Sequence, residues 1–67
     1  MATEERGDFR YLIFVEQPPG WVPAWPQPDF ESEPGAVLAA RELRQRGEHV
    51  IVEKYDQNGA FAGEVLI

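Results

Sequence analysis

Residues 17–30 read QPPGWVPAWPQPDF, and this stretch constrains the fold more than any other part of the chain. It holds five of the six prolines together with both tryptophans, Trp21 and Trp25. Proline fixes φ and has no backbone N–H to donate, so the stretch is neither a helix nor a central strand. We treat residues 17–33 as a loop, the Pro/Trp segment, whose indoles either cover the core or meet a partner.

The residues before the Pro/Trp segment predict a strand. Residues 9–16 read FRYLIFVE and are rich in aromatic and β-branched side chains, which favour extended backbone. Successive side chains of a strand point to opposite faces, so Ile13 and Val15 share one face while Leu12 and Phe14 share the other. Since both faces are apolar at the centre, we expect this strand to be covered on both sides.

The residues after the Pro/Trp segment predict one helix, from about Pro34 to Arg46. Ser32 and several acids precede Pro34, which is the pattern of a helix start, and Gly47 suits the position just past a helix end. At about 100° per residue, one arc of the helix is small and aliphatic, and Leu38 lies opposite that arc. The arc predicted to pack on a sheet consists of Ala36, Val37, Ala39, Ala40 and Leu43.

Two more strands are predicted over residues 48–55 and 60–67, joined by the tetrapeptide DQNG. Asp56, Asn58 and Gly59 hold the positions that favour a type I turn followed by a G1 bulge. The sequence therefore predicts an antiparallel hairpin at the end of the chain.

The tetrapeptide allows two turns, which differ in register. The type I turn pairs apolar residues across the hairpin, namely Tyr55 with Phe61 and Ile51 with Val65. A two-residue turn at Asn58-Gly59 sets Glu53 against Glu64 instead. Carboxylates that face each other repel, so we expect the first register.

Together these elements predict an α+β fold for the whole 67-residue chain as a single domain, in the order β-loop-α-β-β. The sheet is mostly antiparallel, with one helix packed on one face, and has three strands, or four if Trp21 and Val22 pair back onto the first. A connection through a helix joins parallel strands, so we expect the strands at 9–16 and 48–55 to be parallel, with the third between them. Residues 1–8 are expected to fray.

A single helix covers only one face of such a sheet, so the face that bears Leu12 and Phe14 needs a different cover. Burying an aromatic side chain contributes about 1.5–3 kcal/mol, a large share of the stability of a small domain. We therefore expect Trp21 and Trp25 to form a lid over this face. A surface for a partner or a second copy is the alternative.

The charge balance narrows the choice of partner. Twelve acids stand against six bases, a net charge of −6, which opposes direct binding to nucleic acid or to an anionic membrane. The chain has no cysteine, so it forms no disulfide and has no thiol for catalysis or metal binding. No apolar run approaches the length of a membrane span, and the first residues do not resemble a signal peptide. We expect a cytoplasmic protein.

Side chains that support catalysis are few. His49 is the one histidine, and Ser32 precedes the helix, where its hydroxyl is expected to cap the backbone. Asp29, Glu31 and Glu33 lie in the same region, where carboxylates favour the positive end of the helix dipole. We expect no catalytic residue, metal, cofactor or small-molecule substrate.

The favoured hypothesis is a non-enzymatic protein that binds a protein partner, or a second copy of itself, through an apolar surface around the Pro/Trp segment. The residues assigned to that surface are Trp21, Trp25, Phe30 and Leu38. In size and charge the chain resembles the small acidic inhibitors that phages and mobile elements use against host enzymes. No motif carries this likeness, so no residue role follows from it.

Two alternatives stay open: an acidic mimic of nucleic acid that occupies the DNA- or RNA-binding site of a host protein, and a small enzyme or enzyme subunit. The acids assigned to the mimic are Glu16, Glu42, Glu48, Glu53, Asp56 and Glu64. Binding by charge weakens steeply with salt, whereas apolar docking is nearly insensitive to it. Salt dependence therefore separates the mimic from the favoured hypothesis.

Overall fold

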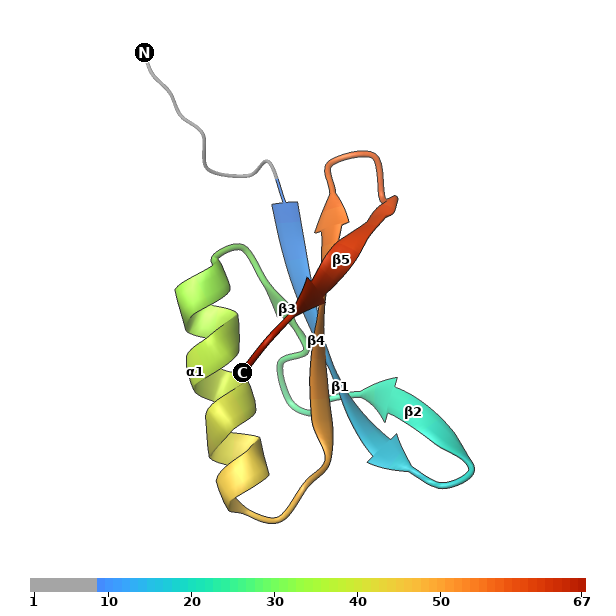
Figure 1. Cartoon of the computed structure of the whole chain (residues 1–67), viewed down its shortest axis with the longest axis vertical. Coiled ribbons are helices and arrows are strands. Elements are labelled where there is room, and N and C mark those ends of the chain that lie inside the picture. Colours follow the sequence, from blue (N-terminus) through green and yellow to red (C-terminus); the bar gives the residue numbers. More distant parts are fainter. Residues whose placement is uncertain (1–8) are drawn as a thin grey trace.

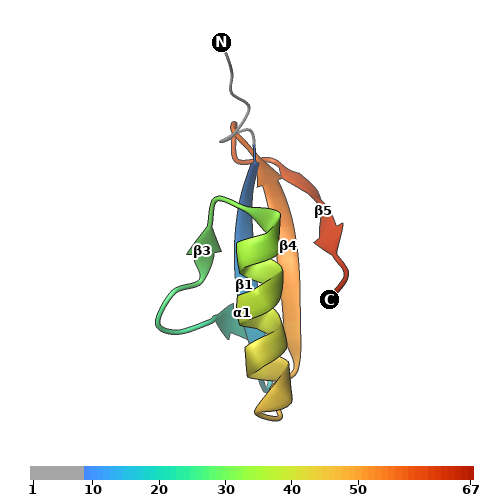
Figure 2. The same ribbon diagram turned by 90° about the vertical axis from the view of Figure 1, so that its left-hand side faces the viewer.

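The computed structural model describes residues 9–67, and the N-terminal residues expected to fray lie outside this range. Within it, one helix and five strands follow each other along the chain (Figure 1). They are β1 (Phe9–Gln17), β2 (Gly20–Pro23), β3 (Asp29–Phe30), α1 (Glu33–Gln45), β4 (Val50–Asp56) and β5 (Phe61–Val65). The helix lies on one face of the sheet and contacts β1, β3 and β4 (Figure 2). The predicted α+β fold is confirmed.

The strand β1 lies at the centre of the sheet. β4 pairs along one edge of β1, and β5 pairs with β4, while β2 and β3 share the other edge of β1. The expectation that the strands at 9–16 and 48–55 run parallel, with the third between them, is wrong, because β1 and β4 pair directly and antiparallel.

The physical reason is an early reversal of the chain between β1 and β2. Because of this reversal, β2 and β3 both run antiparallel to β1 before the chain enters the helix. The helix then connects β3 to β4, and these two strands run in the same direction on either side of β1. The rule that a helix joins parallel strands therefore holds. The strands it applies to are β3 and β4, not β1 and β4.

The Pro/Trp segment runs along the open edge of β1. β2 and β3 each pair with part of that edge. Between them, the N–H of Ala24 donates to the carbonyl of Ile13 over 2.9 Å, and the N–H of Ile13 donates to the carbonyl of Pro28 over 2.8 Å. Proline lacks an N–H but keeps its carbonyl, so a proline-rich segment can still accept the hydrogen bonds that β1 offers.

Because the Pro/Trp segment follows the edge of β1, the prediction that its two indoles form a lid over a face of the sheet is wrong. The Trp21 side chain is 46% exposed and the Trp25 side chain 85% exposed, so neither indole is buried over a face of the sheet. Leu12 and Phe14 are half-buried by their neighbours. The expected short pairing of Trp21 and Val22 onto the first strand is confirmed, whereas β3 was not foreseen.

The core lies between α1 and the inner face of the sheet, which is the face toward the helix. The fully buried residues of this layer are Ile13, Ala36, Ala40 and Val52. The other members of the predicted helix arc are half-buried and Leu38 is exposed, so the predicted core face of the helix is confirmed. Small side chains at Ala36 and Ala40 let the helix backbone lie close to the sheet.

Local hydrogen bonds fix both ends of α1, as the sequence predicts. Ser32 is the N-cap, and its Oγ accepts a hydrogen bond of 3.2 Å from the N–H of Gly35. At the other end, the N–H of Gly47 donates to the carbonyl of Arg44 over 3.0 Å. Gly47 has a φ of 95°, a conformation that favours glycine.

The turn between β4 and β5 is also as predicted. Gly59 has a φ of 85°, and its N–H donates to the carbonyl of Asp56 over 2.9 Å. The side chain of Asp56 accepts hydrogen bonds of 2.9 Å from two backbone N–H groups of the turn. Tyr55 lies opposite Phe61, and their rings meet edge to face with centroids 5.8 Å apart.

A bulge in β5 shifts the rest of this hairpin by one residue. Lys54 lies opposite Gly63, which leaves Ala62 without a partner, and Gly63 has a φ of 140° that favours glycine. The resulting pairs are Val52 with Val65 and Glu53 with Glu64. The expected pairing of Ile51 with Val65 is therefore wrong, and the like-charge pair arises through the bulge.

Replacing Ala40 by leucine tests the close contact between α1 and the sheet. Because Ala40 is fully buried, added methylene groups overpack this layer, and Ala40→Leu is expected to lower the free energy of unfolding by about 1–3 kcal/mol. Urea denaturation followed by circular dichroism measures the change. The same substitution at exposed Ala62 is the control, expected to stay within about 0.5 kcal/mol of the parent. Equal effects at both positions contradict close packing.

Candidate functional site

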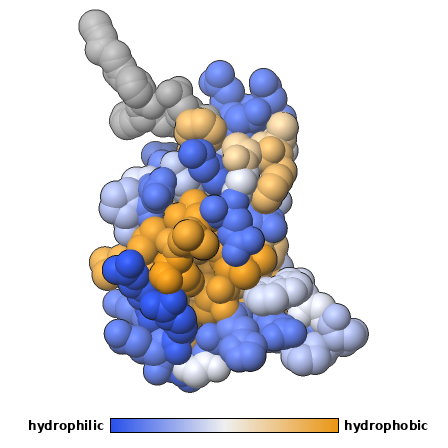
Figure 3. Space-filling view, viewed as in Figure 1, coloured by the Kyte–Doolittle hydropathy of each residue, from blue (hydrophilic) through white to orange (hydrophobic). Residues whose placement is uncertain are grey.

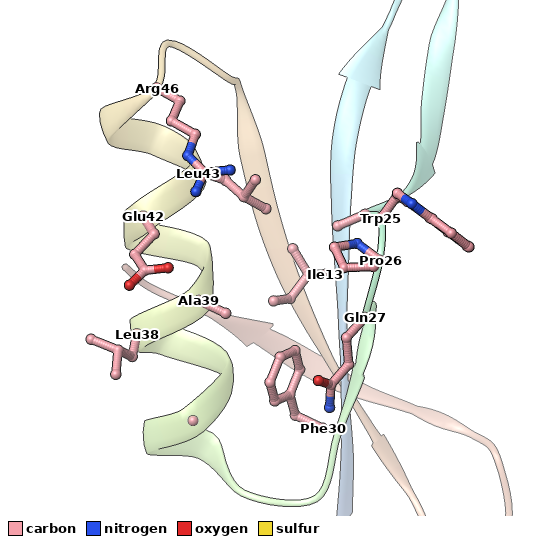
Figure 4. Close-up of a pocket in the computed structure, with 12 residues that line it drawn as sticks. Ile13, Trp25, Pro26, Gln27, Phe30, Leu38, Ala39, Glu42, Leu43 and Arg46 are labelled. Atoms are coloured by element: carbon pink, nitrogen blue, oxygen red, sulfur yellow. The ribbon is translucent and has the colours of Figure 1, made fainter.

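A groove of about 390 Å³ opens between α1 and the loop that joins β2 to β3. Its apolar lining includes Ile13, Ala24, Trp25, Phe30, Leu38 and Leu43. The polar side chains of Gln27, Glu42 and Arg46 also line it (Figure 4). Its volume falls within the range of about 300–1,000 Å³ that binding pockets occupy. The groove is therefore large enough to receive apolar side chains from another molecule.

Three of the four residues predicted for a partner surface line this groove. Leu38 lies on α1 and is 64% exposed, while Phe30 of β3 is half-buried between the sheet and the helix (Figure 4). Trp25 contributes to the wall, and its exposed indole points out of the groove (Figure 4). The fourth residue, Trp21, lies opposite Glu16 and so on the other face of the sheet.

We name that other face, which is turned away from α1, the outer face. Residues opposite each other in neighbouring strands share a face, so the strand registers define its members. Its large apolar side chains are Leu12, Phe14, Trp21, Ile51, Tyr55 and Phe61. Phe61 is 60% exposed. The sequence identified Leu12 and Phe14 on this face, but Ile51 and Phe61 were assigned only to pairs within the hairpin.

Apolar residues also gather between α1 and the end of the chain (Figure 3). Val65 and Ile67 pack against the core, and Nη1 of Arg44 donates to the carbonyl of Ile67 over 2.6 Å. Leu66 lies between them in the sequence and is 89% exposed. The hydrogen bond ties the end of the chain to the last turn of the helix.

The six acids assigned to the nucleic-acid mimic lie in different parts of the molecule. Glu53 and Glu64 face each other on the outer face, whereas Glu42 lines the groove on the helix side. Glu16 contacts His49, with 2.9 Å between Oε1 and Nδ1. Glu48 precedes β4, and Asp56 is its last residue.

An ion pair joins β1 to β3 on the outer face. Nε and Nη2 of Arg10 lie 3.1 and 2.5 Å from Oδ1 and Oδ2 of Asp29. These hydrogen bonds raise the pKa of Arg10 above its ordinary value, and the charge of Asp29 adds to the effect. The guanidinium of Arg10 is therefore engaged within the chain.

Two hydroxyl groups are held in local contacts. The Ser32 hydroxyl caps α1, and the Tyr55 hydroxyl donates to Oε1 of Glu53 over 2.6 Å. Among residues 9–67, no three His, Cys, Asp or Glu side chains come together as metal ligands do. In the same range, no helix is long and apolar enough to cross a membrane.

Comparison with protein-family models, curated proteins and solved structures finds no match to this chain. The candidate site is therefore defined by its own geometry. The groove lies on the helix side of the sheet, and the outer face lies on the opposite side.

The hydrogen bond between Tyr55 and Glu53 predicts that the stability of the folded protein depends on pH. It raises the pKa of Tyr55 above the ordinary 10.0, with smaller contributions from burial and from the charge of Glu53. The folded protein thus holds the phenol proton more tightly than the unfolded chain. This stabilisation is present below the ordinary pKa and is lost as the pH rises through the pKa of the folded state.

Glu53→Gln is expected to lower the pKa of Tyr55 toward its ordinary value. The absorbance of the phenolate, titrated in a Tyr11→Phe background, measures the shift, because the pKa of Tyr11 is raised as well by burial. Glu64→Gln is the matched control and is expected to leave the Tyr55 titration unchanged. An unchanged titration in Glu53→Gln contradicts the contact.

Proposed function

We propose that this chain is a non-enzymatic protein that binds another protein through the groove between α1 and the Pro/Trp segment. The observation that carries the proposal is the exposure of two large apolar side chains beside one groove. Trp25 is 85% exposed and Leu38 is 64% exposed, and both line a hollow with half-buried Phe30 at its wall. Large apolar side chains exposed at the margins of a hollow are typical of interaction sites.

The groove also has the arrangement that protein interfaces favour. Aromatic and aliphatic groups form its wall, while Glu42 and Arg46 lie among the lining residues as polar groups. Interfaces commonly combine an apolar centre with a polar rim, and tryptophan is enriched among the residues that dominate binding energy. Trp25 and Leu38 are the residues that we expect to contribute most.

The proposal includes a mode of action and a location. Binding without catalysis is how small protein inhibitors act, and the short, acidic chain is compatible with that mode. A cytoplasmic location is supported by the absence of cysteine, because a chain without cysteine gains no disulfide from an oxidising compartment. The partner is a different protein or a second copy, which light scattering of the purified chain distinguishes.

Removing Trp25 tests the proposal. Trp25→Ala is expected to abolish capture of the partner from lysate of the source cells, because the substitution removes an exposed anchor. It is expected to change the free energy of unfolding by no more than about 0.5 kcal/mol, as surface substitutions usually do. Pull-down with immobilised protein and urea denaturation measure the two effects.

A leucine pair provides the matched control. Leu38→Ala removes an exposed leucine that lines the groove and is expected to weaken capture, whereas Leu66→Ala removes an exposed leucine that does not line it and is expected to have no effect. Capture is expected to be nearly insensitive to salt. Capture that survives both groove variants and disappears at high salt contradicts the proposal and favours the acidic mimic of nucleic acid.

A further inference from the structure

The outer face is a second apolar surface, separate from the groove. Residues 9–67 place no element over it, since the single helix packs on the inner face. Phe14 lies between Pro23 and Ile51 in neighbouring strands, and Tyr55 and Phe61 form an edge-to-face pair beside the turn of the β4–β5 hairpin. A sheet face with this many apolar side chains is normally packed against another layer.

The charges on this face indicate the chemistry of the missing layer. Arg10 is held by Asp29 over two hydrogen bonds, and Glu16 contacts His49. Glu53 and Glu64 face each other across β4 and β5, and Glu53 accepts a hydrogen bond from the neutral Tyr55 hydroxyl. Within the described range neither has a salt-bridge partner. Directly opposed like charges destabilise a sheet, and a cation from outside the chain relieves that repulsion.

We infer that the outer face binds a segment of another protein that carries lysine or arginine between apolar side chains. Its apolar groups pack on the row formed by Leu12, Phe14 and Ile51, and its cation lies against Glu53 and Glu64. Both carboxylates are central to the inference because Glu53 lies opposite Leu12 and between Ile51 and Tyr55 along β4, with Glu64 opposite it on β5.

A second copy of the chain fits this face less well. Its own outer face presents the same two carboxylates, and Arg10, the one arginine that residues 9–67 place there, is already engaged with Asp29. Each copy also carries a net charge of −6. Face-to-face pairing therefore brings like charges together, whereas a cationic segment is complementary in both charge and polarity.

Selection from a random peptide library displayed on phage tests the inference, with the full chain as target. We expect the enriched peptides to carry lysine or arginine flanked by apolar residues. The double variant Glu53→Gln/Glu64→Gln is expected to weaken their binding by about tenfold or more. The double variant Glu33→Gln/Glu48→Gln changes the net charge equally and is expected to leave binding within about twofold, since both acids are exposed at the ends of α1, away from the outer face and the groove.

The failure of this inference is distinguishable from failure of the proposed function. Peptides that lose binding with Trp25→Ala and Leu38→Ala, but not with Glu53→Gln/Glu64→Gln, occupy the groove and overturn the outer-face inference alone. Selection without enrichment, or enriched peptides without cations, also overturns it. So does a dimer in light scattering that Phe61→Ser dissociates, because the occupant is then a second copy.

Discussion

The rest of this structure depends on one constraint, which is that the edge of β1 facing away from β4 needs hydrogen-bond partners. β1 is the central strand, and Ile13 at its middle is fully buried, so backbone groups along both edges need hydrogen-bond partners. β4 satisfies one edge. The Pro/Trp segment satisfies the other through short pairings and through the carbonyl of Pro28. A segment held along an edge by its backbone cannot also lie across a face.

This constraint gives the two faces of the sheet different surroundings. On the inner face, Ala36 and Ala40 let α1 approach closely, and the groove forms where the loop between β2 and β3 stands apart from the helix (Figure 4). On the outer face, the side chains are covered only by their neighbours in the sheet, and Leu12 and Phe14 are half-buried. The groove and the outer face are therefore distinct apolar surfaces with different polar neighbours.

Features set by nearby residues could be predicted from the sequence. Ser32, Gly47 and Gly59 fix the helix ends and the turn through contacts within a few residues, and the helix arc follows from periodicity. Strand order and the positions of the indoles could not be predicted, because they depend on which distant segment satisfies β1. The residues chosen for the candidate site were mostly brought together, whereas Trp21 was not, since alternation in β2 places it on the outer face.

The prolines in β2 and in the loops on either side of it have a consequence for association between copies. An open strand edge is a template on which further chains add and fibrils grow. Prolines at this margin offer no N–H to an incoming strand, and at the opposite margin the kink at Gly63 and the charge of Glu64 interrupt a regular ladder. Both margins of the sheet therefore disfavour the addition of a strand from another copy.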